Sequence, residues 1–571
     1  MKILRPYYIL IALTSFFACE EKQNADLVIK GGKVATVDES FSIKQAVAIK
    51  GNKIIYVGNE EAVEKYIGQQ TKVIDASGKF VMPGMHDAHC HPYNLGHVEG
   101  EEEEDNYFSV GGSKDLDDLV AKVKEKIKTM KPGDWLIGGG WDQNEWPDKQ
   151  FPVHDKLSAV SPDNPVFLYR HGGNSAFVNA KALEIAGITA ETPDPFGGRI
   201  YRKPNGDPTG FVSNMGNNMV HKHFPKPNKP LEWYHKKYLN AFKTCNEAGL
   251  TAVTDAGIDS EHIEIYKSMV DSGTTTIRAN VMLLNPREGD LEKQFRDVRV
   301  LNYGGEEMMQ VRSIKMYYDG TVGSRGAAFF EPYLDDPERD DNIGVTEVPV
   351  DHVYKVARTA LKTGMQVCPH ALGIRANSEI LDAFEKALKE NPIEDHRFRS
   401  EHAEVVTAED IKRFAEIGVI PSVQPVHCTS DMTFLEDRIG KQRCKESASP
   451  WRGMIDAGLK IACGSDFAVE SHKPLWGIYA AITRQDHLGL PEDGWYAEHC
   501  MTREEAIKGY TIWAAHAAFW DDILGSLETG KLADIVILDK DILTIAPKEI
   551  LTTKVLYTIV NGKIVYQMDR Q

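Results

Sequence analysis

Eight short apolar runs recur through the middle of the chain, and each leads through polar or glycine-rich residues into a segment with helical periodicity. Strands that alternate with helices in this way predict parallel strands joined by crossover helices, and eight such units close into a (β/α)8 barrel. An open doubly wound sheet is the alternative, but no Gly-x-Gly-x-x-Gly motif follows the first run to support a dinucleotide site. We expect the barrel strands at residues 79–91, 165–170, 251–257, 313–320, 365–371, 398–405, 419–425 and 460–466.

Both ends of the chain are rich in predicted strands. Residues 26–57 alternate apolar and polar positions and break at glycines where hairpin turns need a positive φ, and residues 533–566 repeat this pattern. Two such pieces at opposite ends are most simply one domain. We therefore predict a small β-sandwich formed by residues 19–78 and 516–571, around a barrel at 79–515.

The first 18 residues have the pattern of a targeting segment. Lys2 and Arg5 precede an apolar stretch that is too short to span a bilayer, and Cys19 follows a small residue. This arrangement resembles a bacterial lipoprotein signal, although Phe16 stands where leucine is usual. We expect residues 1–18 to be a signal peptide and a lipidated Cys19 to anchor the protein to a membrane outside the cytoplasm; plain secretion and a buried N-terminal strand are the alternatives.

The charge balance limits the classes of partner that the protein is expected to bind. Lys and Arg number 66 and Asp and Glu 84, so the formal net charge is −18. Such a surface repels phosphate backbones, which argues against nucleic-acid binding and leaves small-molecule or peptide substrates. The sequence leaves the oligomeric state open, a homodimer included.

Several residues that can bind metal fall at the ends of predicted strands. His89 and His91 are two apart on a strand, so their imidazoles point to the same face. The ends of three later predicted strands carry His370, His402 and Asp466. Because the carboxyl ends of barrel strands meet at one rim, this set predicts a metal site there. Lys315 lies on a predicted strand as well, and it would repel a cation unless carbon dioxide converted it to an anionic carbamate.

A series of motifs occurs in a fixed order along the chain: PGMHDAHCHP, IKMYYDGTVGSR, EHAEVV, SVQPVH, GSDFAVE and GSLETGKLADIVILD. Together they resemble the metal-dependent amidohydrolase superfamily, and in particular the amidohydrolase 3 group, which includes enzymes like N-substituted formamide deformylase. The resemblance covers nearly all of residues 26–566. It implies a barrel that holds one or two divalent metal ions, usually zinc, beside a small β-sandwich built from both ends.

The resemblance also assigns roles to the metal-competent residues. His89 and His91 would bind the more buried ion, His370 and His402 would bind the second ion, and a carbamylated Lys315 would bridge the two. The number of ions stays open, because a mononuclear site could use a subset of the same ligands.

Asp466 would ligate metal and also act as the general base. A metal ion lowers the pKa of bound water from near 16 to about 7, and Asp466 can take the proton and return it to the departing amine. We therefore expect an enzyme that hydrolyses a non-peptide C–N bond of a small-molecule amide. A metal-dependent isomerase or lyase on the same scaffold and a non-catalytic lipid-anchored binding protein are the alternatives.

Five residues near the strand ends are candidates for substrate binding. Trp141 and Asp142 would supply an aromatic wall and a polar contact, with loop packing as the alternative. Arg325 and Gln424 would pair with substrate or hydrogen-bond to it. Asn174 stands where the resembled family commonly has histidine; it can donate a hydrogen bond to an oxyanion but cannot carry protons.

Two further positions depart from the family pattern. Ile374 stands where aspartate is usual, and Asn214 where an acidic residue is common. His171 could compensate for the missing histidine at position 174, with a surface histidine as the alternative. None of these departures affects a proposed metal ligand, but they change residues expected to surround the substrate. We therefore still expect hydrolysis, while the sequence does not identify the substrate.

Overall fold

The computed structural model describes residues 24–96, 107–225, 229–336 and 339–569. The expected signal peptide at 1–18 and the lipidation site at Cys19 lie outside these residues and stay predictions, as do the domain boundaries. Within the described part of the chain, no helix is long and apolar enough to cross a membrane.

The central body is a (β/α)8 barrel, as the sequence predicts. In the described residues, eight strands pair in parallel, each with the next. They are β6 (Met85–Cys90), β13 (Leu250–Ile258), β14 (Arg278–Leu284), β16 (Met309–Tyr317), β17 (Gln366–Ala371), β18 (Arg399–His402), β19 (Ile420–Val423) and β20 (Ala462–Cys463). Two backbone hydrogen bonds join the segment after β20 to the end of β6, from Asp466 N to His89 O (2.8 Å) and from His91 N to Phe467 O (2.6 Å). These bonds close the ring.

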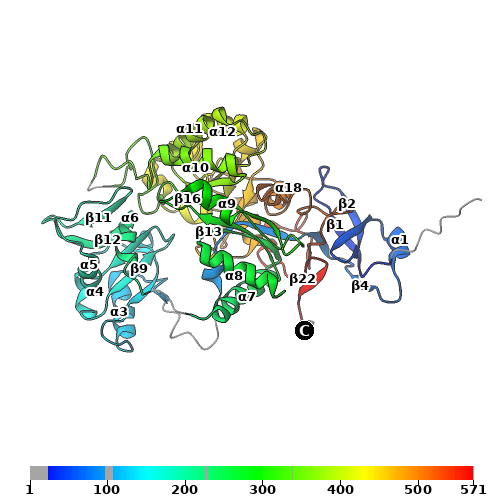
Figure 1. The fold of residues 1–571 in the computed structure, drawn as a ribbon, viewed down its shortest axis with the longest axis horizontal. Coiled ribbons are helices and arrows are strands. Elements are labelled where there is room, and N and C mark those ends of the chain that lie inside the picture. Colours follow the sequence, from blue (N-terminus) through cyan, green and yellow to red (C-terminus); the bar gives the residue numbers. More distant parts are fainter. Residues whose placement is uncertain (1–23, 97–106, 226–228, 337–338, 570–571) are drawn as a thin grey trace, which may run out of the picture.

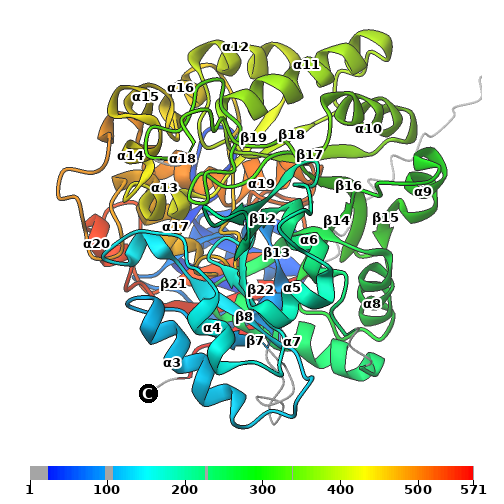
Figure 2. The same cartoon turned by 90° about the vertical axis from the view of Figure 1, so that its left-hand side faces the viewer.

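Helices cover the outside of the barrel (Figure 2). α10 (Val350–Thr363) is typical: it begins after Pro349, ends at Gly364 with a φ of 69°, and buries Val353 and Val356 on its inner face. The other helices of this body are α7 (Leu231–Glu247), α8 (Ser260–Asp271), α9 (Leu291–Val298), α11 (Ile374–Glu390), α12 (Ala408–Ile417), α13 (Pro425–Asp431), α14 (Leu435–Ile439), α15 (Lys441–Ser447), α16 (Trp451–Asp456), α17 (Pro474–Thr483), α18 (Arg503–Gly509) and α19 (Ile512–Ala517). The shorter helices are α2 (Pro92–Leu95), α20 (Pro547–Ile550) and the 3-10 turn η3 (Ala497–His499).

A separate sheet is inserted between β6 and β13, and the sequence analysis did not predict it. Its strands run in the order β11-β12-β10-β9-β8-β7. Their bounds are β7 (Tyr107–Ser109), β8 (Leu136–Trp141), β9 (Val166–Arg170), β10 (Ser175–Val178), β11 (Gly198–Arg202) and β12 (Pro208–Asn214). The sheet is accompanied by α3 (Leu116–Ile127), α4 (Asp155–Val160), α5 (Ala180–Ala186), α6 (Met215–His221) and the turn η2 (Gln143–Glu145). We call this body the insert.

The insert corrects the expected strand assignment. The run at 165–170 is β9 of the insert and not a barrel strand, whereas the third barrel strand is β14, which the sequence analysis missed. An apolar run shows that a strand is buried but not which sheet it joins. β14 is hard to recognise because Arg278 and Asn280, both fully buried, interrupt its apolar residues.

Strands from both ends of the chain form one further sheet, as the sequence predicts. Its order is β23-β22-β21-β5-β1-β2-β3, with β4 paired to β1. The strands are β1 (Leu27–Ala35), β2 (Ile43–Lys50), β3 (Lys53–Gly58), β4 (Lys72–Asp75), β5 (Phe80–Pro83), β21 (Ile535–Leu538), β22 (Val555–Val560) and β23 (Lys563–Gln567), beside α1 (Glu60–Val63) and the turn η1 (Glu64–Tyr66). Leu27 and Ile29 of β1 share a core with Ile535 and Ile559, while Val28 between them belongs to the cluster on the other side with Val63 of α1. We call this body the β domain.

The two smaller bodies flank the barrel at opposite ends. Figure 1 shows the insert at the left and the β domain at the right, and in Figure 2 the insert lies in front of the barrel. Only Gly84 separates β5 from β6, so the β domain adjoins the end where the barrel strands begin. The insert therefore lies over the end where the strands finish.

A buried ion pair links the barrel to the β domain. Arg278 of β14 is fully buried, and its Nε and Nη2 donate to the two carboxylate oxygens of Asp534 at 2.8 and 2.9 Å. Nη2 also donates to Asn561 Oδ1 at 3.0 Å. A buried guanidinium without its carboxylate would be left with an uncompensated charge.

We predict that Asp534→Ala lowers the free energy of unfolding by about 3–5 kcal/mol, because it leaves the Arg278 charge buried and unpaired. Urea denaturation followed by circular dichroism measures this loss. Asp297→Ala, which removes an exposed partner of Lys293, is the matched control and should cost less than about 1 kcal/mol. Equal effects of the two substitutions would contradict the prediction.

Candidate metal centre

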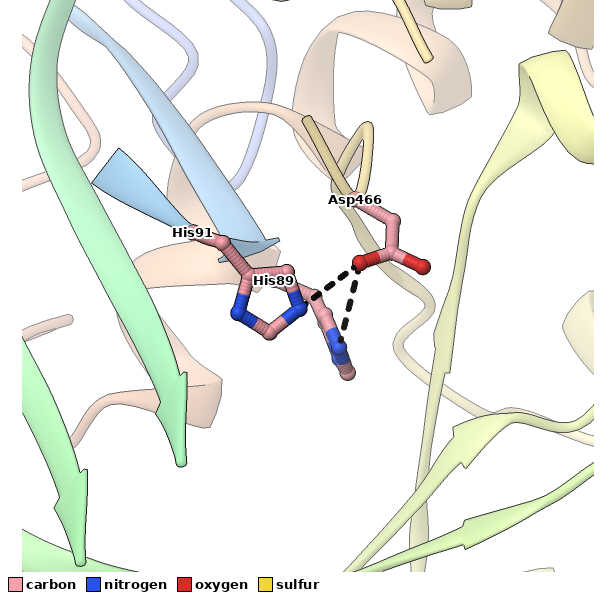
Figure 3. Close-up of side chains that lie close together, drawn as sticks. All are labelled: His89, His91 and Asp466. Carbon is pink, nitrogen blue, oxygen red and sulfur yellow. Dashed lines mark ion pairs between the residues drawn. The ribbon is translucent and has the colours of Figure 1, made fainter. Parts of the chain in front are cut away.

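The first part of the site is a compact group of two histidines and one carboxylate (Figure 3). His89 lies on β6 and His91 directly follows that strand, so both imidazoles are presented at the same end of the barrel. Asp466 follows β20, the neighbour of β6 across the closure of the ring. Its Oδ1 lies 3.0 Å from His91 Nε2 and 3.7 Å from His89 Nε2.

A second group shares the same aspartate and includes a histidine that the sequence analysis missed. His402 ends β18, and His427 lies in the first turns of α13. His427 Nε2 is 3.8 Å from Asp466 Oδ2. The imidazole rings of His402 and His427 are nearly parallel, with centroids 5.9 Å apart. The motif SVQPVH held a signal for this residue. Its proline, Pro425, begins a helix just after strand β19 ends, and this puts His427 about one turn beyond the end of the strand.

The remaining predicted ligands also reach this place. Lys315 of β16 puts its Nζ 3.1 Å from His89 Nε2, and the ring of His370 on β17 lies 4.5 Å from that of His402. All six predicted ligand residues therefore line one cavity of about 380 Å³, which we call the metal cavity. Their convergence follows from the barrel, because parallel strands bring their carboxyl ends to one rim.

Burial keeps His89 and His402 neutral. It lowers the pKa of His89 to about 4, and it lowers the pKa of His402 well below the usual value, helped by the neighbouring His370. Both are uncharged at neutral pH, which is the form that binds metal. Burial also lowers the pKa of Lys315, which favours the uncharged amine.

Three histidines of the metal cavity each have an acceptor at Nδ1. Glu401 Oε2 lies 2.6 Å from Nδ1 of His89, and Asp319 Oδ1 lies 3.1 Å from Nδ1 of His370. Gln424 Oε1 lies 2.7 Å from Nδ1 of His402. These contacts fix the proton on Nδ1 and leave the Nε2 lone pair for a ligand in the cavity.

Gln424 is therefore placed differently from the sequence expectation. It is buried behind His402, where its Oε1 contacts the imidazole, and it is not among the residues that line the metal cavity. A contact of Gln424 with substrate stays a prediction. Strand β19 ends at Val423, and the next residue turns its side chain toward the adjacent strand β18.

Asp466 is held as a carboxylate by its surroundings. Burial would raise its pKa, but the contact with His91 Nε2, 3.0 Å away, and the neighbouring imidazoles outweigh that effect and hold the pKa well below its usual range. Its backbone has a φ of 57° and that of His402 a φ of 76°, both in the left-handed region that side chains rarely adopt. Backbone strain of this kind persists only where the surrounding structure enforces it, and it is common at functional sites.

Two of the predicted substrate residues line the metal cavity. Asn174 places its Nδ2 3.5 Å from His370 Nε2, and Asp142 accepts a hydrogen bond from Arg170 Nη2 at 2.6 Å. His171 lines the cavity as well, 4.0 Å from Glu470. All of these residues come from the insert, which therefore supplies one wall of the site.

Two others lie elsewhere. Trp141 is fully buried in the core of the insert, stacked on Trp146, and its Nε1 donates to the Leu168 carbonyl. Arg325 is held by Asp335 at 3.1 Å and does not line the metal cavity. Core packing thus accounts for Trp141 and an ion pair for Arg325, and the expected substrate contacts of both residues stay predictions.

A second cavity of about 390 Å³ adjoins the metal cavity, and Asn174 and Tyr317 line both. Asn214 belongs to this second cavity, where its Nδ2 donates to Glu347 Oε1 at 3.2 Å. Burial raises the pKa of Glu347 to about 7. Ile374, in contrast, begins α11 and lines neither cavity.

The donor set fits a divalent transition metal. Nε2 of both His402 and His427 is buried without a hydrogen-bond partner among the described residues, which is costly unless a ligand occupies that place. Imidazole nitrogens combined with one carboxylate suit zinc and similar ions. Fold and site together define a barrel protein with groups of residues at the carboxyl ends of its strands that could hold a metal ion.

The chain belongs to the amidohydrolase family, whose sequence profile matches residues 72–566. It is 30% identical over 559 residues to Protein LONG AFTER FAR-RED 3 of Arabidopsis thaliana, covering 95% of this chain and 92% of that protein. It is 27% identical over 551 residues to the N-substituted formamide deformylase of Arthrobacter pascens, covering 95% and 99%.

Solved structures agree on the fold. An uncharacterized metal-dependent hydrolase from Pyrococcus horikoshii superposes with a TM-score of 0.68 at 23% identity, over 91% of this chain and 99% of that one. The predicted family resemblance and the predicted barrel are both confirmed.

We predict that Gln424→Leu weakens metal binding about 10–100-fold, because His402 loses the acceptor that fixes its tautomer. Titration of metal-free protein with zinc, followed by calorimetry, measures the affinity. Gln442→Leu, at an exposed glutamine of α15, is the matched control and should leave it unchanged. An unaltered affinity in Gln424→Leu would show that the hydrogen bond does not orient the ligand.

Proposed function

We propose that this protein is a metal-dependent amidohydrolase that cleaves a non-peptide C–N bond of a small-molecule amide. The observation that carries the proposal is the convergence of His89, His91 and Asp466 in a cavity large enough for a small substrate. The N-substituted formamide deformylase among its relatives supports amide hydrolysis.

The metal would be held by His89, His91 and Asp466, with His370 and His402 beside them. When bound, a divalent ion, zinc on this donor set, supplies an activated water and polarises the substrate carbonyl. The net reaction adds water across the amide: oxygen bonds to the carbonyl carbon, the C–N bond breaks, and the amine leaves with a proton.

In this proposal Asp466 transfers that proton. It is ionised at neutral pH, so it can accept a proton from the attacking water and pass it to the leaving nitrogen. An amine departs poorly as an anion, which makes this second transfer necessary.

In this proposal Asn174 contacts the substrate. Its Nδ2 reaches from the insert to the edge of the metal cavity near His370, where it can donate a hydrogen bond to the carbonyl oxygen as negative charge develops there. The adjoining cavity offers room for the part of the substrate remote from the bond that breaks.

Lys315 completes the proposed centre as a carbamate. Its amine is fully buried beside His89, and the lowered pKa favours the uncharged form that would react with carbon dioxide. The nitrogen would bond to the carbon of carbon dioxide and release one proton to solvent. The product is an anion, which would bridge two cations, whereas an ammonium at the same place would repel them.

We predict that Asp466→Asn lowers kcat by about 10²–10⁴-fold, because the general base and acid is lost. The measurement is a turnover screen of N-formyl, N-acetyl and cyclic amides that follows released carboxylate. Asp297→Asn, at an exposed aspartate of α9, serves as the control and should keep full activity. No carboxylate release from any of these amides by the zinc-loaded wild-type protein would refute the proposed function.

We predict that Lys315→Ala loses bound metal, because the bridging anion is gone. Metal analysis of the purified variant measures the loss, and ¹³C-labelled bicarbonate should give the wild-type protein a carbamate signal that the variant lacks. Lys293→Ala, at an exposed lysine of α9, should keep both. Full metal content and activity in Lys315→Ala would show that no carbamate is needed.

A further inference from the structure

The cavity that adjoins the metal cavity is lined to a large extent by asparagine side chains. It lies between the insert and the barrel, and its volume of about 390 Å³ is in the range of pockets that hold small molecules. We call it the asparagine cavity. Four of its asparagines come from the insert and one directly follows barrel strand β14: Asn174, Asn214, Asn217, Asn218 and Asn285.

Three of these asparagines have an amide oxygen without a partner. In Asn214, Asn217 and Asn285 the amide nitrogen already has an acceptor in the protein, at 3.2, 3.4 and 2.8 Å respectively. The amide oxygen of each is buried and has no hydrogen-bond partner among the described residues. Because a buried carbonyl oxygen without a donor is costly, these three oxygens favour a ligand that donates hydrogen bonds.

The amide oxygens need to move little to reach such a ligand. The hydrogen bonds that hold the amide nitrogens of Asn214 and Asn217 are long, and the last side-chain torsion of asparagine is soft. A small rotation of the amide therefore presents Oδ1 to the cavity, while the side chain keeps its place in the wall.

The formal charges in this lining balance. Burial raises the pKa of Glu347 to about 7, and above that pH its carboxylate faces Arg287, whose Nη2 lies 3.3 Å from Glu347 Oε2. Burial also lowers the pKa of His221, which favours its neutral imidazole, and Tyr169 and Tyr317 add phenol groups. The described lining therefore has no net charge that would attract an ionic ligand.

We propose that the asparagine cavity binds the part of an amide substrate remote from the scissile bond, and that this part is an uncharged group rich in hydroxyls, such as a polyol. A hydroxyl both donates and accepts, so it can satisfy the three amide oxygens and also meet the other amides and phenols of the wall. An ammonium group only donates, and a carboxylate only accepts. The inference rests on the proposed function for the bond that breaks, and on the lining alone for the group that binds.

Shared residues connect this cavity to the reacting part of the site. Gly173, Asn174 and Tyr317 line both cavities. Asn174 Nδ2 lies 3.5 Å from His370 Nε2, on the side of the metal cavity. A substrate whose carbonyl lies among the candidate metal ligands can therefore extend past Asn174 into the asparagine cavity.

The test compares the N-formyl and N-acetyl amides of glucamine and hexylamine, whose carbon chains have the same length but differ in hydroxyl groups. At a pH above the pKa of Glu347, we expect the zinc-loaded protein to favour the glucamine amides in kcat/KM by about 10²–10⁴-fold, because a site that hydrogen-bonds hydroxyls rejects an analogue without them. Hexylamine amides with a terminal ammonium or carboxylate group should do no better than the plain hexylamine amides.

Two variants test the asparagines directly. Asn217→Leu and Asn285→Leu should each reduce the preference for glucamine over hexylamine amides by about 10-fold, because each removes one acceptor. This ratio is the informative measurement, since a general loss of folded protein lowers both rates and leaves their ratio unchanged. Asn240→Leu, at an exposed asparagine of α7 that lines neither cavity, is the matched control and should keep the wild-type ratio.

The same compounds separate this inference from the proposed function. If none of the amides is hydrolysed, the proposed function fails, and calorimetric titration of the intact amides into the zinc-loaded protein then measures their affinities. Tighter binding of the glucamine amides, reduced in the two variants, would support the inference in that case as well. Equal kcat/KM or affinity for the glucamine and hexylamine amides, a preference for the charged derivatives, or an unchanged ratio in both variants would overturn it.

Discussion

The closure of the barrel is the constraint on which the site depends. The hydrogen bonds between the segment after β20 and the end of β6 run through the backbones of Asp466, His89 and His91, so the residues that complete the ring also carry the ligands. The chain separates these residues by more than 370 positions, and only the closed ring brings their side chains within 3.7 Å. Fold and metal centre are thus formed by the same contacts.

Buried charge organises the shell around the ligands. Glu401 contacts both His89 and Arg399, and although burial would raise its pKa, the charge of Arg399 and the hydrogen bond with His89 lower it to about 2. A carboxylate that stays ionised at the back of an imidazole makes that imidazole a stronger metal ligand. The barrel interior therefore contributes electrostatics as well as packing at this end.

The sequence predicted those features that depend on the periodicity of apolar residues and on the position of polar residues at strand ends. The barrel, the shared terminal sheet and the convergence of His89, His402 and Asp466 all follow from patterns that repeat along the chain. Prediction failed where the assignment of a strand to a sheet depends on tertiary contacts. The run at 165–170 is a buried strand, but it belongs to the sheet of the insert and not to the barrel. Trp141 likewise looks suited to a pocket wall, and only its packing against Trp146 shows that it fills a core.

Side-chain direction was the other limit. Gln424 and His427 are three residues apart in one motif, yet one lies behind a ligand and the other faces the cavity. The turn from β19 into α13 decides between these positions, and a sequence does not record the angle of that turn. The local motif indicated that functional residues lie in this segment, but it did not show which of them faces the cavity.

The ion pair between Arg278 and Asp534 has a consequence for how the protein is made. The guanidinium sits on the third barrel strand, and its carboxylate lies 256 residues further along, in a sheet whose last strands come from the end of the chain. While the ribosome is still adding those residues, the barrel strand carries a charge with no counterpart. The native ion pair at this end of the barrel can therefore form only after Asp534 has been added to the chain, so the contact between barrel and β domain is among the last that the growing chain can make.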